Sequence, residues 1–592
     1  MGRLWLVPAP EHNSQENRCV LTSAPARQGQ KTQLIQQSLC QHSSKGVDSG
    51  HWALTPGTDS MSAALNNRLS TFIAFAVTTL VVAGSATAQE PPPLVFRVDA
   101  FEVVGDNPLD PKATAAALEP FTGEFDGLDG LYAANDALES LLRKRGFIFH
   151  RVVLPPQELD RGTVTLKVVT FALGANRVSG NERVSDARAI NSLSALTPGI
   201  VPNLRNVSRS LAVANEHPGR QYSLNFSRSE DEADTLDANI RVREYRPYSV
   251  FSSINNIGTD DSGNLRATMG AEYNDLFSRD HTATFTYSTS PDNADDVRQF
   301  GFNYRAPVYR LNGWFQGFYI HSDVDVGNVQ QFFDISGSGD FAGLGFRHWL
   351  LPFGRYRHSV SLLLQDRRFD SSVDNAVTGV GLPGISTVVR SRPLSLTYQG
   401  SYRWARSDVS FAVDLVQNLS WGGNNRDRDY SAVRIGAESE WNAIRFGIGY
   451  NHQLPRGWFA VGKVAGQYAD EPLIPGEQYG LGGEFTVRGY EERAIAGDDA
   501  VLFNFELWTP PIRAAYGMRF FTFADVGFKH LEEPVTPQIT SDTISSAGLG
   551  FRVNVREYLY VTAAYGHVIA HARGETSDKG NVKTHFNVVL KY

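Results

Sequence analysis

Apolar and polar side chains alternate along the chain from residue 245 to residue 592. In the segment PLSLTYQGSYRW, Leu394, Leu396 and Tyr398 fall on one face, with serine, threonine and glutamine between them. The segments IRFGIGYNHQ and YLYVTAAYGHV repeat the pattern. A period of two over segments of about ten residues, with one apolar and one polar face, is typical of a transmembrane β-barrel.

Counting such segments predicts a barrel of about 16 strands, an even number as in bacterial barrels. The count treats residues 429–450 as one long or bulged strand and leaves a long connection at 470–499. A barrel of this size encloses an aqueous lumen unless something fills it. The predicted fold class is therefore mainly β, with a 16-stranded transmembrane β-barrel at 245–592. One or more large soluble β-sandwiches are the alternative.

A different periodicity precedes the barrel. Between 94 and 170 the predicted order is strand, helix, helix, strand, strand, and Leu131, Ala134 and Leu138 share one face of the second helix. The same order recurs between 171 and 244, which indicates two α+β repeats. A small sheet covered by helices leaves an edge to which an extended peptide can add by backbone pairing. Rigid spacer domains are the alternative interpretation.

The N-terminal region contains an export signal. From Met61 the chain has a positively charged start, a short apolar stretch and the small-residue motif ATA that ends at Ala88. We expect a secretory signal peptide at 61–88, cleaved between Ala88 and Gln89; a retained membrane anchor is the alternative. Residues 1–60 are polar and lack apolar periodicity, so we expect a non-native upstream extension, with Met61 as the true start.

Composition excludes several classes of function. Both cysteines, Cys19 and Cys40, precede the predicted cleavage site, so the mature chain is expected to have no disulfides. The net charge of −8 gives no indication of nucleic-acid binding. No Gly-x-Ser-x-Gly motif or metal-type His/Cys spacing is present, and DDSGN at Asp260 is interpreted as a turn. We therefore expect no enzymatic activity, no cofactor and no metal.

Three motifs carry a family resemblance. LPPQELDRGTVTLKVV closes the first repeat, LGGEFTVRGY lies within the connection at 470–499, and FTFADVG lies at 521–527. With these motifs in this order, residues 94–592 resemble the outer-membrane transporters of two-partner secretion, the FhaC/ShlB/HecB haemolysin secretion/activation family, which is related to BamA. The resemblance implies that 94–170 and 171–244 are polypeptide-transport-associated (POTRA) domains in the periplasm.

The resemblance also implies a role for the connection at 470–499, as a loop folded into the lumen. A guanidinium binds a carboxylate through two parallel hydrogen bonds, so Arg488 is expected to be held by Asp525 on the barrel wall. Without the resemblance, Arg488 is interpreted as a solvated loop residue. The expected loop anchor comprises Val487, Arg488, Gly489 and Tyr490, and the expected wall partners are Phe523, Asp525 and Gly527.

The last strand ends on an aromatic residue and resembles the signal that hands outer-membrane barrels to their assembly machinery. Its expected signal residues are Phe586, Val588, Leu590 and Tyr592. Family members often carry an N-terminal helix that plugs the pore. Here only 89–93 separate the predicted cleavage site from the first strand, so the inward loop alone is expected to close the pore, or the pore is leakier.

The function implied by the resemblance is a pore that moves a large exoprotein from the periplasm to the cell surface, and possible activation of that exoprotein is left open. The implied partners are an exoprotein with an N-proximal secretion domain, outer-membrane lipid and lipopolysaccharide, and the barrel assembly machinery. The expected location is the outer membrane of a Gram-negative bacterium, as a monomer that binds no nucleic acid. A BamA-like barrel-insertion factor is the alternative.

Overall fold

The computed structural model describes residues 19–22 and 95–592, except 160–161, 233, 260–261, 295–296, 325, 330–332, 337, 373–385 and 574–581. The predicted signal peptide and the cleavage site at Ala88 and Gln89 lie outside the described residues. So does the predicted extension at 1–60, apart from its short strand at 19–22.

The first α/β domain packs two helices against a mixed sheet in which β6 lies between β3 and β5. The second helix buries Leu131, Ala134, Leu138 and Leu142 against this sheet, the apolar face that its periodicity predicts. The elements are β2 (Val95–Val98), β3 (Ala100–Gly105), α1 (Pro111–Leu118), η1 (Glu119–Phe121), β4 (Gly123–Asp126), α2 (Asp129–Lys144), β5 (His150–Val153) and β6 (Thr163–Thr170).

The second α/β domain repeats this order of elements. Its sheet has the order β1-β8-β9-β7, and β1 pairs antiparallel with the outer edge of β8. Leu211 on α4 packs with Tyr222 and Phe226 on β8, so helix and sheet share one core. The elements are β1 (Cys19–Thr22), β7 (Ala172–Ser179), α3 (Asp186–Asn191), α4 (Leu204–Ala214), β8 (Arg220–Arg228) and β9 (Thr235–Glu244).

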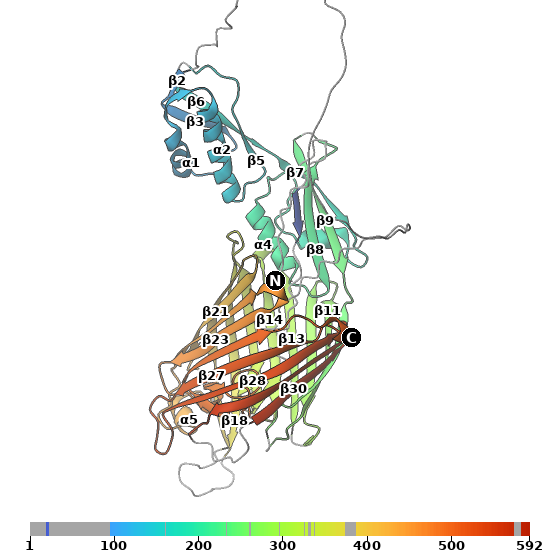
Figure 1. The fold of residues 1–592 in the computed structure, drawn as a ribbon, viewed down its shortest axis with the longest axis vertical. Coiled ribbons are helices and arrows are strands. Elements are labelled where there is room, and N and C mark those ends of the chain that lie inside the picture. The colour runs from blue at the N-terminus through green and yellow to red at the C-terminus, as the bar shows by residue number, and fades with distance from the viewer. Residues whose placement is uncertain are drawn as a thin grey trace, which may run out of the picture.

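The C-terminal part is a closed antiparallel barrel (Figure 1). Its strands are β10 (Tyr248–Asn255), β11 (Arg266–Leu276), β12 (His281–Thr289), β13 (Arg298–Val308), β14 (Gly313–Ser322), β17 (Gly339–Trp349), β18 (Arg357–Ser372), β19 (Ser386–Ser391), β20 (Pro393–Arg403), β21 (Ser407–Asn418), β22 (Asn442–Gln453), β23 (Phe459–Ala469), β26 (Asp499–Trp508), β27 (Arg519–His530), β28 (Ser541–Val555), β29 (Leu559–Ala570) and β30 (Val582–Lys591).

The barrel has sixteen strands among the described residues, because β19 and β20 follow each other along the same neighbour, β18. Pairing of β10 with β30 closes it, so no sheet edge is exposed to lipid. The predicted mainly β fold with a 16-stranded barrel is confirmed. The prediction of one strand over 429–450 is wrong: this stretch contains the end of the helix α5 (Asp427–Ser431), a loop, and most of β22.

The two faces of the wall differ as the alternation predicts. Large apolar side chains are exposed on the outer face, among them Phe315, Leu344, Leu362, Ile448 and Leu549. Polar side chains are buried on the inner face, among them Gln299, Ser359, Ser395, Gln467 and Asp525. An apolar exterior around a polar interior suits a barrel surrounded by lipid. Among the described residues, no helix has the length and apolarity needed to cross a membrane.

The remaining short elements lie in the connections. The structure contains β15 (Val326–Val329), β16 (Phe333–Ser336), β24 (Tyr479–Leu481), β25 (Ile495–Gly497), η2 (Tyr309–Leu311), η3 (Pro455–Gly457), η4 (Pro475–Glu477) and η5 (Arg513–Ala515). The helices η2, η3 and η5 form tight turns in the connections between β13 and β14, β22 and β23, and β26 and β27. The helix α5 lies at the barrel end away from the α/β domains (Figure 1).

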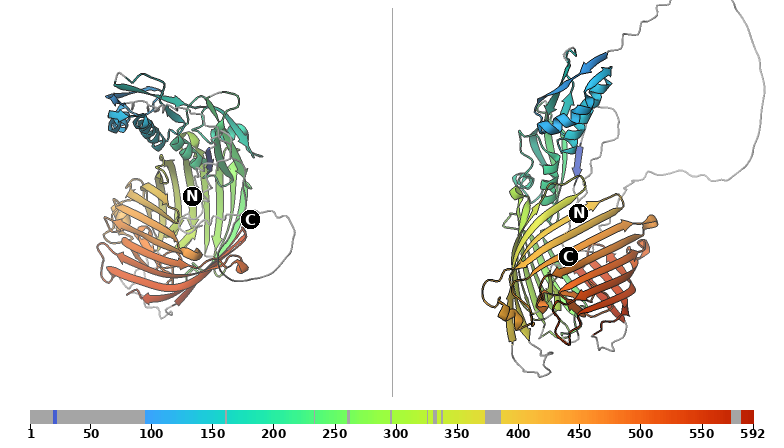
Figure 2. Two further views of the ribbon diagram at one scale, coloured as in Figure 1. Left: turned by 45° about the horizontal axis from the view of Figure 1, so that its top comes forward. Right: turned by 90° about the vertical axis from the view of Figure 1, so that its left-hand side faces the viewer.

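The second α/β domain contacts the barrel end that carries the tight turns. Arg188 donates to Asp275 at 2.6 Å, and both Arg188 and Arg220 reach Asp280 in the turn between β11 and β12. Charged and buried contacts of this kind fix the domain at the mouth of the barrel, and Figure 2 shows the two α/β domains extending away from it. We call this contact the domain–barrel joint.

Candidate functional site

The connection between β23 and β26 enters the barrel. Its two arms pair as β24 and β25, in the register Tyr479 with Gly497 and Leu481 with Ile495. Beyond them, Leu481 and Val487 are fully buried in a cluster with Leu502 and Ile544 of the wall. We call residues 470–498 the inward loop. Because these wall residues point to the inner face, the inward loop lies in the lumen.

Arg488 at the tip of the inward loop is bound by two carboxylates. Its Nε and Nη2 donate to the two oxygens of Asp525, each at 2.8 Å, and its Nη1 donates to Glu506 at 2.7 Å. Its backbone N–H also donates to Asp525, at 3.2 Å. Asp525 has no exposed surface, and Arg488 is 5% exposed. Every charge in this cluster therefore has an opposite partner and directed hydrogen bonds.

Aromatic rings and an amide complete the cluster. The guanidinium carbon of Arg488 lies 3.7 Å from the centre of the Phe523 ring, a cation–π distance. Asn504 donates to Asp525 at 2.8 Å and to the carbonyl of Thr486 at 2.6 Å. These contacts fix the orientation of the Asp525 carboxylate and of the backbone just before the loop tip.

Gly489 and Tyr490 contact the wall farther round. Gly489 has a φ of +97°, and its N–H donates to Nε2 of His585 at 3.0 Å. A Cβ on Gly566 would come within 2.6 Å of the Gly489 nitrogen, so both backbones need glycine here. The hydroxyl of Tyr490 accepts the N–H of Ser545 at 3.2 Å and donates to a carbonyl of β29.

The structure brings together the residues singled out at the loop tip and on the wall. Val487 packs against Gly527, where a side chain on the glycine would lie 3.1 Å from the valine. The residues of the last strand lie elsewhere: Leu590 and Tyr592 are exposed, on the face opposite His585. The predicted residues Phe586 and Val588 lie on this same outward face of β30.

A second set of contacts anchors the inward loop on the other side of the lumen. The side chain of Glu477 has no exposed surface and accepts from Arg367 at 2.7 Å, Arg445 at 3.2 Å and Ser391 at 2.7 Å. Gln467 donates to the Glu477 carbonyl at 3.2 Å. With the tip contacts, the inward loop touches the wall from β18 round to β30, more than half of the barrel in strand order.

A third contact joins the two ends of the inward loop. Asp498 accepts two hydrogen bonds from Arg434, one of them at 2.7 Å, and also accepts the N–H of Leu473 at 2.9 Å and the N–H of Glu532 at 2.9 Å. Arg434 belongs to the neighbouring connection that carries α5. The neck of the loop is thus held by a buried ion pair.

Sequence reasoning missed Glu477, Asp498, Glu506 and His585. Glu506 had a signal, since it alternates with Asn504 and Trp508 on the inner face of β26. No sequence signal pointed to Glu477 or Asp498, because their arginine partners lie on other strands and connections, far away along the chain. Among the described residues no group of three or more His, Cys, Asp or Glu side chains could hold a metal ion.

Comparisons with known proteins agree on one family. The family described as haemolysin secretion/activation protein ShlB/FhaC/HecB matches residues 235–553, and the ShlB-type POTRA domain matches residues 96–170. The outer membrane transporter CdiB of Dickeya dadantii is 21% identical over 388 residues, which cover 62% of this chain and 65% of CdiB. The heme/hemopexin transporter protein HuxB of Haemophilus influenzae is 21% identical over 431 residues, which cover 71% and 73%.

Solved structures show the same fold. CdiB from Escherichia coli matches with a TM-score of 0.71 at 18% identity, over 87% of this chain and 93% of CdiB. CdiB from Acinetobacter baumannii matches with a TM-score of 0.66 at 16% identity, over 85% and 91%. At this identity the structural match establishes the fold alone.

Proposed function

The chain belongs to the haemolysin secretion/activation family of ShlB, FhaC and HecB, the transporters of two-partner secretion, and we propose that it exports one large exoprotein across the outer membrane. The barrel spans the membrane and the POTRA domains lie in the periplasm. The exoprotein enters unfolded from the periplasm, passes through the lumen and folds outside. Folding outside makes return unfavourable, so no ATP is needed.

The observation that carries this proposal is the inward loop. A static pore has no use for a segment held by three buried ion-pair sets, two on different parts of the wall and one on a neighbouring connection. Such a segment closes the lumen and, because its contacts are discrete, it can move as a unit when they break. We propose that the contact of Arg488 with Asp525 holds the loop closed and guides its return.

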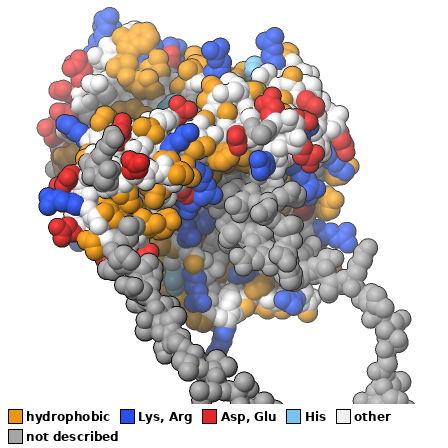
Figure 3. Space-filling model, turned by 90° about the horizontal axis from the view of Figure 1, so that it is seen from above, with side chains coloured by type: hydrophobic (Ala, Val, Ile, Leu, Met, Phe, Trp, Pro, Cys, Tyr) orange, Lys and Arg blue, Asp and Glu red, His pale blue; other side chains and the backbone are white. Residues whose placement is uncertain are grey.

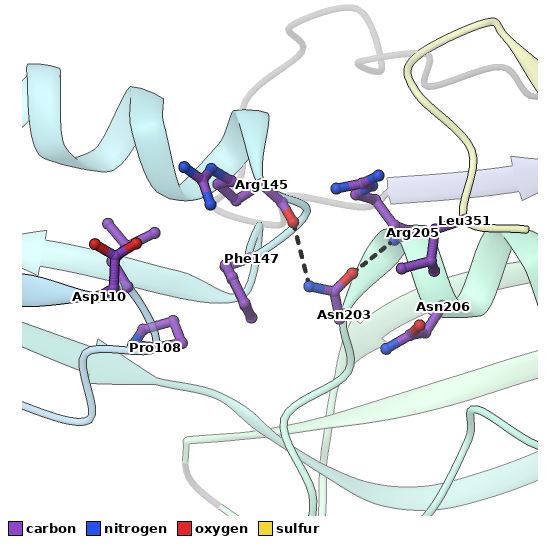
Figure 4. Close-up of a pocket in the computed structure, with 9 residues that line it drawn as sticks. Pro108, Asp110, Arg145, Phe147, Asn203, Arg205, Asn206 and Leu351 are labelled. Atoms are coloured by element: carbon purple, nitrogen blue, oxygen red, sulfur yellow. Dashed lines mark hydrogen bonds between the residues drawn. The ribbon is translucent and has the colours of Figure 1, made fainter. Parts of the chain in front are cut away.

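A cavity on the periplasmic side of the barrel supports transport from the periplasm outward. A cavity of about 360 Å³ lies where the two α/β domains meet the barrel turn at Leu351. Figure 4 shows Asn203 between the domains, bonded to the carbonyl of Arg145 at 3.3 Å and to the N–H of Arg205 at 2.9 Å. The cavity is lined by apolar, basic, acidic and amide side chains, among them Phe147, Arg205 and Asp110. We propose that a passing chain contacts this cavity on its way from the domains to the barrel mouth.

The surface seen from the domain end has no uniform charge. Where described residues cover it, basic, acidic and hydrophobic side chains are mixed (Figure 3). A mixed surface favours capture of a segment through its backbone more than through a large field of one sign. We propose that the exoprotein's N-proximal region is captured in this way by the POTRA domains.

Deletion of the gene tests the proposal. We expect one large protein to disappear from the medium or the cell surface while the levels of other outer-membrane barrels stay unchanged. Loss of many barrels at once would contradict export of a single partner and would support the insertion factor. We further propose that the chain acts as a monomer without catalytic activity, and that its last strand, from Phe586 to Tyr592, directs its own insertion.

A further inference from the structure

The two α/β domains differ at one position beside the sheet edge. The same number of residues separates the end of α2 from the start of β5 as separates the end of α4 from the start of β8. Glu139 and Arg209 therefore occupy the same place, one turn before the helix end, beside the strand that follows. The charge at this place is reversed between the domains.

In the first domain, Glu139 closes the edge of β5. Its carboxylate accepts the outward N–H of Val152 at 3.2 Å and is held by Arg151 at 2.7 Å and by Arg143. Two prolines, Pro155 and Pro156, follow β5 after Leu154, and proline has no N–H to offer. An added strand would have to displace Glu139 from the Val152 N–H and would find no donor at either proline. The β5 edge is thus blocked.

In the second domain, the edge of β8 is longer, and the expected cleavage after Ala88 would remove β1, the strand that pairs with it in the structure. The outward N–H of Tyr222 is taken by Asn215 at 2.6 Å, but β8 continues to Arg228 beyond it. Over Ser223–Phe226 this edge pairs antiparallel with β1, which shows that it accepts an added strand. Arg209 cannot block it as Glu139 does, because a guanidinium has no hydrogen-bond acceptor.

Arg209 also brings an unmatched charge to this edge. Its Nη2 donates to the neutral side chain of Asn206 at 3.3 Å, and its buried Nε meets no acceptor within the described part of the chain. Burial lowers the pKa of Arg209, and no carboxylate among the described residues opposes that effect. A guanidinium in this setting gains from an incoming anionic acceptor.

We propose that the second α/β domain, and not the first, captures the exported polypeptide, as an extended segment that adds antiparallel to β8 over Ser223–Arg228 and places an acidic side chain against Arg209. The proposal rests on the proposed export function and specifies its receptor edge. Backbone pairing tolerates many sequences, while the guanidinium selects among them by charge.

Peptide binding tests the charge preference. Two short peptides of alternating threonine and valine, one with a central glutamate and one with a central lysine, are titrated by fluorescence anisotropy against protein purified from the outer membrane in detergent. We expect the glutamate peptide to bind at least about tenfold more tightly. Arg209→Gln should remove this difference, and Arg209→Glu should weaken binding of the glutamate peptide further. Equal binding of both peptides by the unchanged protein would overturn the charge preference.

The matched control is Glu139→Gln, which neutralises the equivalent position in the first domain and should leave binding to β8 unchanged. If Glu139→Gln alters affinity while Arg209→Glu does not, the capture edge is β5 and the proposal is wrong.

Disulfide trapping locates the edge independently. Ser223 and Val153 occupy equivalent places on β8 and β5, and protein cleaved after Ala88 contains neither Cys19 nor Cys40, so no native thiol competes. A cysteine-bearing glutamate peptide should cross-link to Ser223→Cys and not to Val153→Cys. Preferential cross-linking to Val153→Cys would overturn the assignment. These assays do not involve secretion. Failure of the capture proposal is therefore distinguishable from failure of the export proposal, which gene deletion tests separately.

Discussion

The guanidinium of Arg488 and the carboxylate of Asp525 meet through two hydrogen bonds of 2.8 Å, at a point where Asp525 has no exposed surface. Removing one partner of a buried pair costs about 3–5 kcal/mol because the other charge is left uncompensated. The loop tip is thus held to the wall by a contact whose loss the barrel itself can survive, since the sixteen strands close without it.

Arg488→Ala should therefore abolish secretion while leaving the barrel inserted. Asp525 would lose the guanidinium that binds both of its oxygens, and the loop tip would leave the wall. The measurement is the amount of exoprotein in the medium together with heat-modifiable mobility of the barrel on gels. Arg488→Lys keeps the charge but not the planar fork, so it should retain only part of the secretion. Full secretion by Arg488→Ala would show that Arg488 has no role in transport.

Gly566→Ala should displace the loop tip from the opposite side. Its added Cβ would lie 2.6 Å from the nitrogen of Gly489, which cannot give way without breaking the bond to His585. We expect secretion to fall severalfold and the inward loop to become accessible to protease. Gly447→Ala is the matched control, because a Cβ on Gly447 meets nothing within 4 Å. Equal behaviour of the two variants would argue against a close fit at Gly489.

Glu477→Gln should make the pore leak. The substitution leaves Arg367 and Arg445 without their shared carboxylate while the loop tip remains bound to Asp525. One side of the lumen then opens, so we expect higher conductance in planar bilayers and greater uptake of large antibiotics by cells. Glu438→Gln, at an exposed position in the neighbouring connection, is the control. A tightly closed Glu477→Gln pore would show that the tip contacts alone close the lumen.

The domain–barrel joint should weaken as the pH falls from 7 to 4.5. Burial, together with nearby Arg220, lowers the pKa of His217 to about 4. Its Nε2 donates to the carbonyl of Asn274, and its Nδ1 accepts the N–H of Gly219 at 3.2 Å, so the docked form needs the neutral ring. In the undocked state the His217 ring has its ordinary pKa of about 6.5. Between this pKa and the lower pKa of the docked ring, the undocked state therefore binds more protons.

The docked state therefore loses about 2 kcal/mol between pH 7 and pH 4.5. Hydrogen exchange of the turn between β11 and β12 measures it and should accelerate as the pH falls. His217→Gln should flatten this dependence, whereas His571→Gln, at an exposed position outside the joint, should not. Exchange that stays constant from pH 7 to 4.5 in the unchanged protein would contradict this prediction.

The purified protein should begin at Gln89. Cleavage after the small-residue motif that ends at Ala88 removes everything before it, including both cysteines. N-terminal sequencing of protein from the outer membrane checks this. Recovery of any residue before Met61 would show that the upstream segment is translated.

Much of the architecture is local in the sequence and could be predicted from it. The period of two along 245–592 places apolar residues toward lipid and polar residues toward the lumen, because successive side chains of a strand point to opposite faces. The helical periodicity before it predicts the two α/β domains. The prediction of one strand over 429–450 was wrong. A short helix and a strand follow each other there, and the alternation of side chains does not mark the boundary between them.

The loop's position in the lumen and its main contact, Arg488 with Asp525, were expected from motifs and a resemblance, without geometry. Only the tertiary structure decided that Glu506 shares Arg488, that Glu477 holds the opposite wall, and that Glu139 caps an N–H on the edge of β5. The physical reason is distance along the chain. Alternation fixes which face a side chain takes, whereas ion pairs between distant segments form only when barrel closure and domain docking bring those segments within hydrogen-bonding distance.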